Sequence, residues 1–212
     1  MRGMLISLEG PDGCGKSTHA RLLSEWLRSM GMRVLLTKEP TNSVFGTTIK
    51  KALGGRITLP PEAEAVLFAA DRAHHVSRII EPALRRGMIV ISERYVHSSL
   101  AYQPARGVPE DFVRELNRHV PRPDLTIILD APTRETMRRV KPRGPDLFER
   151  SSGFQGAVRR NYLKLAREEG LTVIDTSGPK EEVQGRIREV VARALKIPRR
   201  ATCLSSRKAA GS

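Results

Sequence analysis

The segment EGPDGCGKST, residues 9–18, constrains the fold of this chain more than any other feature. It follows the apolar run Met4–Glu9 and precedes an amphipathic pattern that starts at residue 16. The spacing is Gly-x4-Gly-Lys-Ser, which is typical of a loop that wraps a phosphate between a strand and a helix. Glycines let successive backbone N–H groups converge on the anion, and the start of the helix adds its positive end. A glycine turn that only caps a helix is the alternative, but strand, loop and helix stand in the order that phosphate binding requires.

This loop predicts binding of a nucleoside triphosphate and chemistry on a phosphoryl group, without naming the acceptor. Lys16 is expected to reach the terminal phosphates, and Ser17 to hold Mg²⁺, the expected cofactor. Cys14 lies beside the start of the helix, where the pKa of a thiol is expected to fall. The residues expected to bind the triphosphate, which is ATP if the family resemblance described below holds, are Gly10, Pro11, Asp12, Gly13, Cys14, Gly15, Lys16, Ser17 and Thr18.

Apolar runs alternate with helical patterns along the rest of the chain. Strands are predicted at Met4–Glu9, Arg33–Thr37, Met88–Ser92, Leu125–Asp130 and Leu171–Asp175. Helical patterns lie near 16–30, 62–86, 109–119, 132–140, 155–169 and 180–196. Several strand candidates are continuously apolar, as expected for strands covered on both faces. The sequence therefore predicts an α/β fold of the P-loop NTPase type, with three layers and a five-stranded parallel sheet flanked by helices.

The domain organisation follows from where this alternation stops. Residues 1–196 are expected to form one P-loop domain, and residues 197–212 a basic flexible tail without an acidic residue. The segment 141–153 lies between two helical patterns and is rich in proline, glycine and charge. We expect it to form a short lid that closes over a ligand.

The net charge of +14 allows a nucleic acid, a membrane surface or a small polyphosphate as the partner. Aromatic residues make up only 4% of the chain, too few for a base-stacking platform, so a nucleic-acid partner is not expected. No apolar run reaches the length of about 18 residues that a membrane span needs, and the N-terminus lacks a signal-peptide pattern. Cys14 and Cys203 lie far apart and outside any metal-ligand spacing, so we expect a cytoplasmic protein.

Two further segments point to the acceptor side of the reaction. The apolar run 88–91 ends in Glu93 and Arg94, and the carboxyl ends of parallel strands are where such folds place their chemistry. In the helix 62–86, Phe68 and Arg72 are one turn apart, so they share a face that could stack on a base and donate to its carbonyl. Packing of Phe68 against a neighbouring helix or a second subunit, with Arg72 solvated, is the alternative. The expected core stripe on the opposite face is Val66, Ala70, Ala73, Ile80 and Leu84.

Together these segments resemble the thymidylate kinase family of nucleoside monophosphate kinases. The matching pieces are EGPDGCGKST, TKEP, LFAADR, ERYVHSSLAYQ, PDLTIILD and ERSSGFQGAVRRNYLKLA, in family order from residue 4 to about residue 175. The phosphate loop is shared with many kinases, whereas the RYxxSSxAYQ segment and the Phe68/Arg72 pair are more specific. The resemblance implies ATP-dependent phosphorylation of dTMP to dTDP by direct in-line transfer, with Mg²⁺, in a homodimer.

The resemblance also implies roles for individual residues. Asp12 would contact the deoxyribose 3′-hydroxyl, and Glu39 would belong to the dTMP site. Phe68 would stack on thymine, Arg72 would bind its O4, and Ser99 and Gln103 would face the base. Tyr102 would lie where a 2′-hydroxyl would go, and Arg94 would clamp the phosphates. Because Gly13 stands where some members carry a loop arginine, the lid would supply that cation, from Arg150 first or Arg143 second.

Two departures from the family pattern leave alternatives open. The family usually has Asp-Arg-Tyr, and this chain has Glu93-Arg94-Tyr95, so the expected contact of Glu93 with the metal is altered. Glu-Arg here also resembles the deoxynucleoside kinases, where the Glu takes a proton from the 5′-hydroxyl. Lys38 replaces a common arginine. A nucleic-acid-dependent ATPase or a nucleotide switch is a further alternative, although the Asn/Thr-Lys-x-Asp motif of a guanine switch is absent from the sequence.

Several other residues have weaker assignments. Asp130, at a strand end, could hold a metal-bound water or be satisfied by backbone N–H groups. His74, His75, His97 and His119 show no ligand spacing, so solvated or locally bonded side chains are expected. The additional apolar residues of the helix 62–86, Leu67, Val76 and Ile79, favour burial of a second face, as in a dimer.

Overall fold

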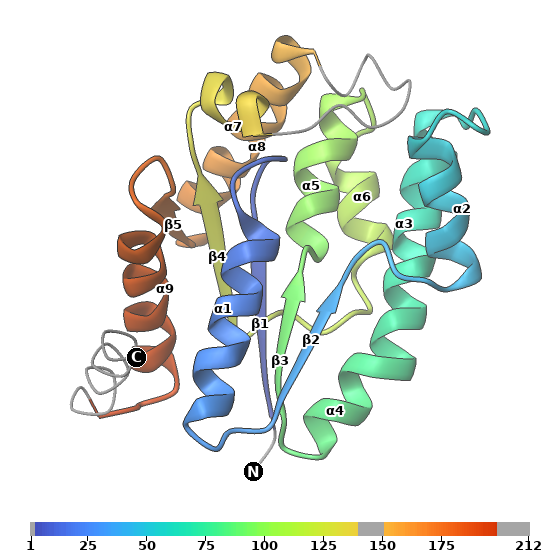
Figure 1. Ribbon diagram of the computed structural model, residues 1–212. Helices are drawn as coiled ribbons and strands as arrows, with labels where there is room; N and C mark the ends of the chain where they lie inside the picture. Colours follow the sequence, from blue (N-terminus) through green and yellow to red (C-terminus); the bar gives the residue numbers. More distant parts are fainter. Residues whose placement is uncertain (1–2, 140–150, 199–212) are drawn as a thin grey trace.

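In the described part of the chain, the sheet has five parallel strands, as the sequence predicted. The computed structural model describes residues 3–139 and 151–198. The strand order is β2-β3-β1-β4-β5, with every pair parallel (Figure 1). The strand bounds are β1 Met4–Glu9, β2 Val34–Lys38, β3 Ile89–Glu93, β4 Leu125–Asp130 and β5 Thr172–Asp175. Each lies within one residue of the predicted range, because continuous apolar runs between turns are a strong local signal.

Helices cover both faces of the sheet and make three layers (Figure 1). On one face, Ile6 and Leu8 of β1 pack against Leu23 and Leu27 of α1. On the other face, Leu5 packs with α4 and the turn before it. The helical bounds are α1 Lys16–Ser29, α2 Val44–Leu53, α3 Pro61–His75, the π-helical turn η1 Val76–Ile80, α4 Glu81–Arg85, α5 Val96–Ala105, α6 Glu110–Leu116, α7 Thr133–Arg139, α8 Ser152–Glu169 and α9 Lys180–Ala194.

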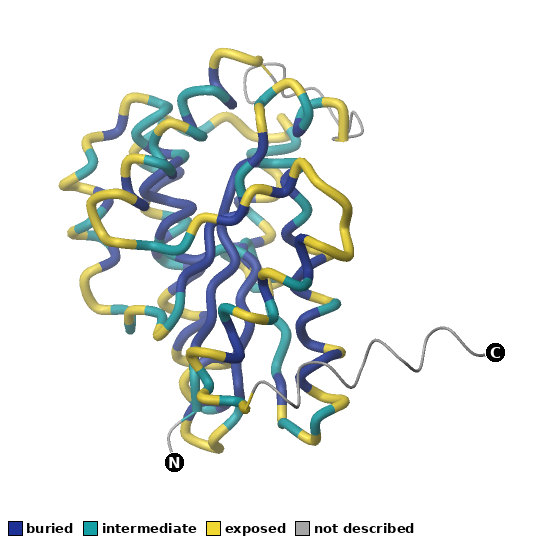
Figure 2. The backbone as a smooth tube through the Cα atoms, turned by 90° about the vertical axis from the view of Figure 1, so that its left-hand side faces the viewer, coloured by how far each residue is buried: buried dark blue, intermediate teal, exposed yellow. Residues whose placement is uncertain are grey.

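The register of the central strands brings their carboxyl ends to one edge. Leu8 of β1 stands beside Glu93 of β3, and Lys38 of β2 stands on the other side of Glu93. β1 and β3 are buried along most of their length, as the dark blue strands at the centre of Figure 2 show, whereas β2 ends at the exposed Lys38. Parallel α/β sheets place their ligands at this edge.

Two helices were missed by the sequence patterns. α2 follows Ser43, whose side chain accepts a hydrogen bond from the Gly46 N–H and caps the helix. α5 is buried over most of its surface, including His97, Ser98 and Gln103. A helix covered on all sides lacks an apolar stripe, so the periodicity that reveals amphipathic helices is absent from it.

The predicted core stripe of the segment 62–86 is wrong in its first half. Val66 is 45% exposed and Ala73 is exposed, whereas Arg72, which we expected on the opposite face, is buried. The buried positions include Ala65, Ala69, Arg72, Val76, Ile80 and Leu84, and also the polar residues Glu64, Asp71 and His75. The segment is also not one uniform α-helix, because the π-helical turn η1 interrupts it.

The lid prediction and most of the tail prediction fall on residues 140–150 and 199–212, which lie outside the described residues. At the start of the predicted tail, Ile197 still packs against the main core. Within the described ranges, no helix combines the length and the apolar character that crossing a bilayer requires.

Candidate functional site

The phosphate-binding loop runs from β1 into α1. Gly10, Gly13 and Gly15 all have positive φ angles, of 135°, 80° and 91°. At Gly10 a Cβ atom would come within 2.1 Å of the Leu129 carbonyl oxygen, so only glycine fits between the two strands. The Lys16 ammonium is buried and donates to the carbonyl oxygens of Gly10 and Pro11, at 2.9 and 2.7 Å. The Lys16 ammonium therefore lies against the backbone of the phosphate-binding loop itself.

The environment of Cys14 contradicts the expectation of a reactive thiol. Its side chain is fully buried in the main core, against β1 and α1. Burial raises the pKa of Cys14, and the nearby charge of Lys16 only partly offsets this. The prediction of a lowered pKa is wrong, because proximity to a helix N-terminus does not determine whether the side chain faces water.

Oxygen ligands meet where β3 ends beside the start of α1. The Ser17 hydroxyl donates to Glu93 Oε1 at 2.7 Å, and the Lys38 ammonium reaches the same oxygen at 3.1 Å. Ser17, Lys38 and Glu93 line a cavity of about 400 Å³ together with Lys16, Arg94 and Arg139. A hydroxyl and one carboxylate fit Mg²⁺, which is usually held by one or two protein oxygens, by waters and by the substrate phosphates. In the described part of the chain no cluster of three or more His, Cys, Asp or Glu side chains could hold a metal by itself.

A second, smaller cavity of about 150 Å³ lies beside the first. The sequence-predicted acceptor residues all line it, although they come from the phosphate loop, the end of β2, α3, the end of β3 and α5. They are Asp12, Glu39, Phe68, Arg72, Arg94, Ser99, Tyr102 and Gln103. Pro40, Leu53, Glu64 and Ser98 complete the lining and were not predicted.

Arg94 lies where the two cavities meet. It is one of the non-glycine residues with a positive φ, 70°, which aims its side chain back across the ends of the strands. Its guanidinium forms an ion pair with Asp12 and donates to Ser98 Oγ at 3.1 Å and to the Tyr102 hydroxyl at 3.3 Å. Partial burial raises the pKa of Asp12, but the charges of Arg94 and Lys16 outweigh it and hold that pKa below its ordinary value.

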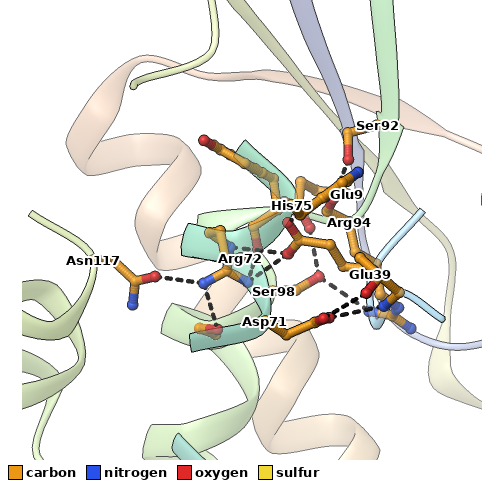
Figure 3. Close-up of polar contacts among 12 residues, drawn as sticks. Glu9, Glu39, Asp71, Arg72, His75, Ser92, Arg94, Ser98 and Asn117 are labelled. Carbon is orange, nitrogen blue, oxygen red and sulfur yellow. Dashed lines mark hydrogen bonds and ion pairs between the residues drawn. The ribbon is translucent and has the colours of Figure 1, made fainter. Parts of the chain in front are cut away.

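Arg72 lies among polar partners from several segments of the chain, including Glu39 and Asn117 (Figure 3). It is buried, with 1% of its surface exposed. Its Nε donates to Glu39 Oε2 at 2.9 Å, and its Nη2 donates to the Tyr95 carbonyl oxygen at 2.9 Å. Its Nη1 donates to Ser99 Oγ at 3.0 Å and to Asn117 Oδ1 at 2.5 Å. A guanidinium has five N–H donors, and Nη2 also lies 2.9 Å from Glu39 Oε2, so protein acceptors engage all of its nitrogens. The interpretation of Arg72 as a solvated side chain is wrong.

Gln103 differs from its neighbours in this cavity. It is 2% exposed and lines the cavity, yet its side chain makes no hydrogen bond to the part of the chain that the structure describes. Phe68 is half-buried in the same wall. The cavity therefore offers a free amide and an aromatic ring, the groups that a planar base with polar edges requires.

Some supporting residues were overlooked in the sequence. Asp71 accepts hydrogen bonds from Thr41 N, Thr41 Oγ1 and Ser43 Oγ, at 2.8, 2.5 and 2.7 Å, and so fixes the loop after β2. His75 is buried and lies 3.0 Å from Glu39 Oε1. The sequence signal for Asp71 was its place beside Arg72 in LFAADR. Once Arg72 is assigned to a binding site, an adjacent carboxylate on the same helix is a candidate for a supporting role.

The remaining predicted residues have simpler surroundings. Asp130 is held by two hydrogen bonds from Arg159, at 2.8 and 2.9 Å, so its carboxylate is satisfied by a side chain and not by backbone N–H groups. His97 lies 3.1 Å from Glu169 Oε2. Arg143 and Arg150 lie outside the described residues, and Arg139, which lines the larger cavity, was not predicted.

Comparisons with known proteins agree with this geometry. The family model described as Thymidylate kinase matches residues 8–187. A probable thymidylate kinase of Pyrococcus abyssi is 46% identical over 204 residues, covering 92% of this chain and 98% of that protein. A probable thymidylate kinase of Thermococcus onnurineus is 45% identical over 202 residues, covering 91% and 98%. A probable thymidylate kinase of Pyrococcus horikoshii is 51% identical over 174 residues, covering 78% and 84%.

Proposed function

The chain belongs to the thymidylate kinase family, and on this premise we propose how its residues carry out the reaction. The protein is an ATP-dependent phosphotransferase that converts dTMP to dTDP. The observation that supports the residue assignment is the junction of the two cavities. Asp12 and Arg94 line both of them, so a phosphate in the larger cavity and a nucleotide in the smaller one would meet at these side chains.

The donor side is formed by the phosphate-binding loop. ATP would place its phosphates in the 400 Å³ cavity, against the loop N–H groups and the start of α1. Lys16 would exchange its two carbonyl partners for phosphate oxygens, which are stronger acceptors because they are charged. Burial lowers the pKa of Lys16, with a further contribution from Arg94, and the phosphates would restore it.

Mg²⁺ would be held by Ser17 and Glu93 together with the phosphates. When bound, it supplies positive charge that offsets the charge of the transferred group. The ammonium of Lys38 now neutralises Glu93 from the exposed side of the site. Glu93 is one methylene longer than the aspartate that is usual in the family. Its carboxylate nevertheless lies 2.7 Å from the Ser17 hydroxyl, so the two residues can still act on the same metal ion.

The acceptor side would hold dTMP with its base in the 150 Å³ cavity. Phe68 would stack on thymine, Gln103 and Ser99 would face its polar edge, and Tyr102 would lie against the sugar. A carbonyl of the base that approaches Arg72 would share a donor that already has a protein acceptor. The role of Arg72 toward O4 thus remains a prediction, and Glu39 would act by holding Arg72.

Transfer itself would need positioning and charge more than covalent chemistry. Arg94 would clamp the acceptor phosphate and stabilise the charge that spreads over the equatorial oxygens. Its hydrogen bonds to Ser98 and Tyr102 hold it in place before substrate arrives. An arginine of the lid, Arg150 or Arg143, would add a second cation.

A deoxynucleoside kinase would need Glu93 to face the acceptor hydroxyl. Glu93 lines the phosphate cavity and not the acceptor cavity, and its Oε1 is engaged by Ser17 and Lys38. This arrangement favours a nucleotide, which brings its own phosphate and needs cations instead of a base. A nucleic-acid-dependent ATPase or a switch is not favoured by an acceptor cavity of about 150 Å³.

The test is ADP release from Mg-ATP with dTMP, dUMP, dCMP, UMP, thymidine and deoxycytidine as separate acceptors. We expect dTMP to give the highest kcat/KM, with little turnover of either nucleoside. Turnover of thymidine above that of dTMP would establish the nucleoside kinase. Stimulation of ATP hydrolysis by DNA or RNA, with no product from any acceptor, would establish the ATPase.

The assembly and location are further parts of this proposal. A homodimer is supported by Val66 and Ile79, which leave 45% and 44% of their surfaces exposed on α3 and η1. Val76, which we also assigned to a second buried face, packs in the core of its own chain. A cytoplasmic location fits a protein whose two substrates are nucleotides.

A further inference from the structure

We propose that Asn117 is a positioning residue for acceptor-base selectivity, acting on the base only through Arg72. The inference rests on the proposed function, in which the base occupies the smaller cavity. Asn117 directly follows α6 and does not line that cavity, whereas its partners Arg72 and Ser99 do. It lines a different hollow, on the other side of α5.

The contact between Asn117 and Arg72 is short and enclosed. Asn117 Oδ1 lies 2.5 Å from Arg72 Nη1, and the two residues are 6% and 1% exposed. Figure 3 shows Asn117 on the opposite side of the guanidinium from Glu39. Glu39 and the Tyr95 carbonyl oxygen hold Nε and Nη2, so Asn117 is the acceptor that fixes the Nη1 side from outside the cavity.

The orientation of the Asn117 amide is fixed by a second hydrogen bond. Its Nδ2 donates to the Val113 carbonyl oxygen at 2.7 Å, one turn earlier in the chain. An amide has one oxygen and one NH₂ group, so Nδ2 on Val113 leaves Oδ1 for the arginine. Val113 is itself buried among Ala65 of α3 and Leu100 of α5. The Asn117 Oδ1 atom is therefore held in place by a well-packed part of the fold.

The Nη1 group of Arg72 links Asn117 to a residue that lines the cavity. It carries two hydrogens, one for Asn117 Oδ1 and one for Ser99 Oγ, 3.0 Å away. Because Ser99 accepts from Arg72, its own hydroxyl hydrogen is free to donate, and Ser99 lines the cavity. A donor at this point favours a base with a carbonyl, such as thymine, over one with an amino group, such as cytosine. Asn117 thus determines which way the donors of Arg72 and Ser99 point.

Removal of the Asn117 oxygen would leave a buried N–H of a cation without an acceptor. Such a group reorients toward any other acceptor within reach, because an unmade hydrogen bond to a charged group is costly. Asn117→Leu should therefore raise the KM for dTMP about 10-fold to 100-fold, the scale of one hydrogen bond to a charge. It should also reduce the preference for dTMP over dCMP by a similar factor, while the KM for ATP stays the same.

Three variants separate positioning from folding. Asn117→Asp keeps an oxygen for Arg72 but sets its other oxygen against the Val113 carbonyl, so it should lose thermal stability and keep base selectivity. Asn117→Leu should lose selectivity. Asn161→Leu is the matched control, because Asn161 Nδ2 bonds to the Ala101 carbonyl at 2.9 Å and does not touch Arg72. It should lose stability and keep selectivity.

The measurements are kcat and KM for dTMP, dCMP and ATP, with melting temperature for each variant. Selectivity lost in Asn117→Leu alone supports the inference. Selectivity that falls in proportion to melting temperature across all three variants, or is unchanged in Asn117→Leu, overturns it. A wild-type protein without activity on dTMP would instead overturn the proposed function, and isothermal titration of dTMP and dCMP would then test whether Asn117 affects base binding.

Discussion

Replacement of Arg94 by methionine tests the junction of the two cavities. Methionine keeps the length of the apolar stem and removes the charge and the donors. In the structure the guanidinium is already held by Asp12, by Ser98 Oγ at 3.1 Å and by the Tyr102 hydroxyl at 3.3 Å. Only 14% of the side chain is exposed, so Arg94 is ordered before any substrate binds.

The size of the effect follows from this preorganisation. Loss of one fixed donor to a charge that develops in the transition state costs about 2.7–4 kcal/mol, or about 10²–10³ in kcat. The stability cost should be small by comparison. The Asp12 side chain is 45% exposed, and an ion pair with a partner this exposed contributes at most about 1 kcal/mol. The φ of 70° is equally strained for both side chains, so the backbone contributes no difference.

The assay is steady-state ADP release with saturating Mg-ATP and varied dTMP, with thermal unfolding followed in parallel. Arg159→Met is the matched control, because Arg159 pairs with Asp130 at 2.8 and 2.9 Å and lines neither cavity. It should lose some stability and keep kcat. A kcat within a factor of about three of wild type in folded Arg94→Met, against the 10²–10³ expected of a lost preorganised donor, would remove Arg94 from the transfer step.

Phe68→Ala should raise the KM for dTMP at least about 5-fold, because stacking contributes about 1–3 kcal/mol per base, while the KM for ATP is unaffected; equal effects on both substrates would argue against stacking. Glu93→Gln should raise the Mg²⁺ concentration for half-maximal rate about 10-fold or more, as seen in a magnesium titration at fixed ATP, and an unchanged titration would exclude Glu93 from the metal site. Cys14 should react slowly with iodoacetamide at pH 7 and at pH 9, with or without ATP. Burial raises its pKa, so the thiol stays neutral at pH values where an exposed thiol would already lose its proton. Fast, ATP-sensitive labelling of Cys14 in peptide mass spectra would show that this burial is wrong.

The sheet and the phosphate loop could be predicted because both are encoded locally. The strands β1, β3 and β4 are mainly apolar runs that end in polar residues, and the glycine spacing is typical of a single loop conformation. α5 was not predicted as a helix because it is buried on most sides and carries serines where an apolar stripe would be. Its site residues were identified only through the resemblance to a family.

The surroundings of Arg72 could not be predicted from local patterns. Its acceptors include Glu39, 33 residues before it, and Asn117, 45 residues after it, so only the folded chain shows that its donors are engaged. Helical periodicity placed it opposite the core because an arginine counts as polar in any such pattern. Cys14 was misjudged for the same reason, since its burial depends on packing against other elements.

The central claim is that the acceptor brings its own phosphate, so the most direct measurement is a competition. Equal concentrations of dTMP and thymidine are incubated with a limiting amount of Mg-ATP, and the products are separated and quantified. The geometry of Arg94 and Glu93 predicts dTDP as the product, with thymidine left unchanged. Consumption of thymidine with accumulation of dTMP, at equal or greater rate, would contradict it.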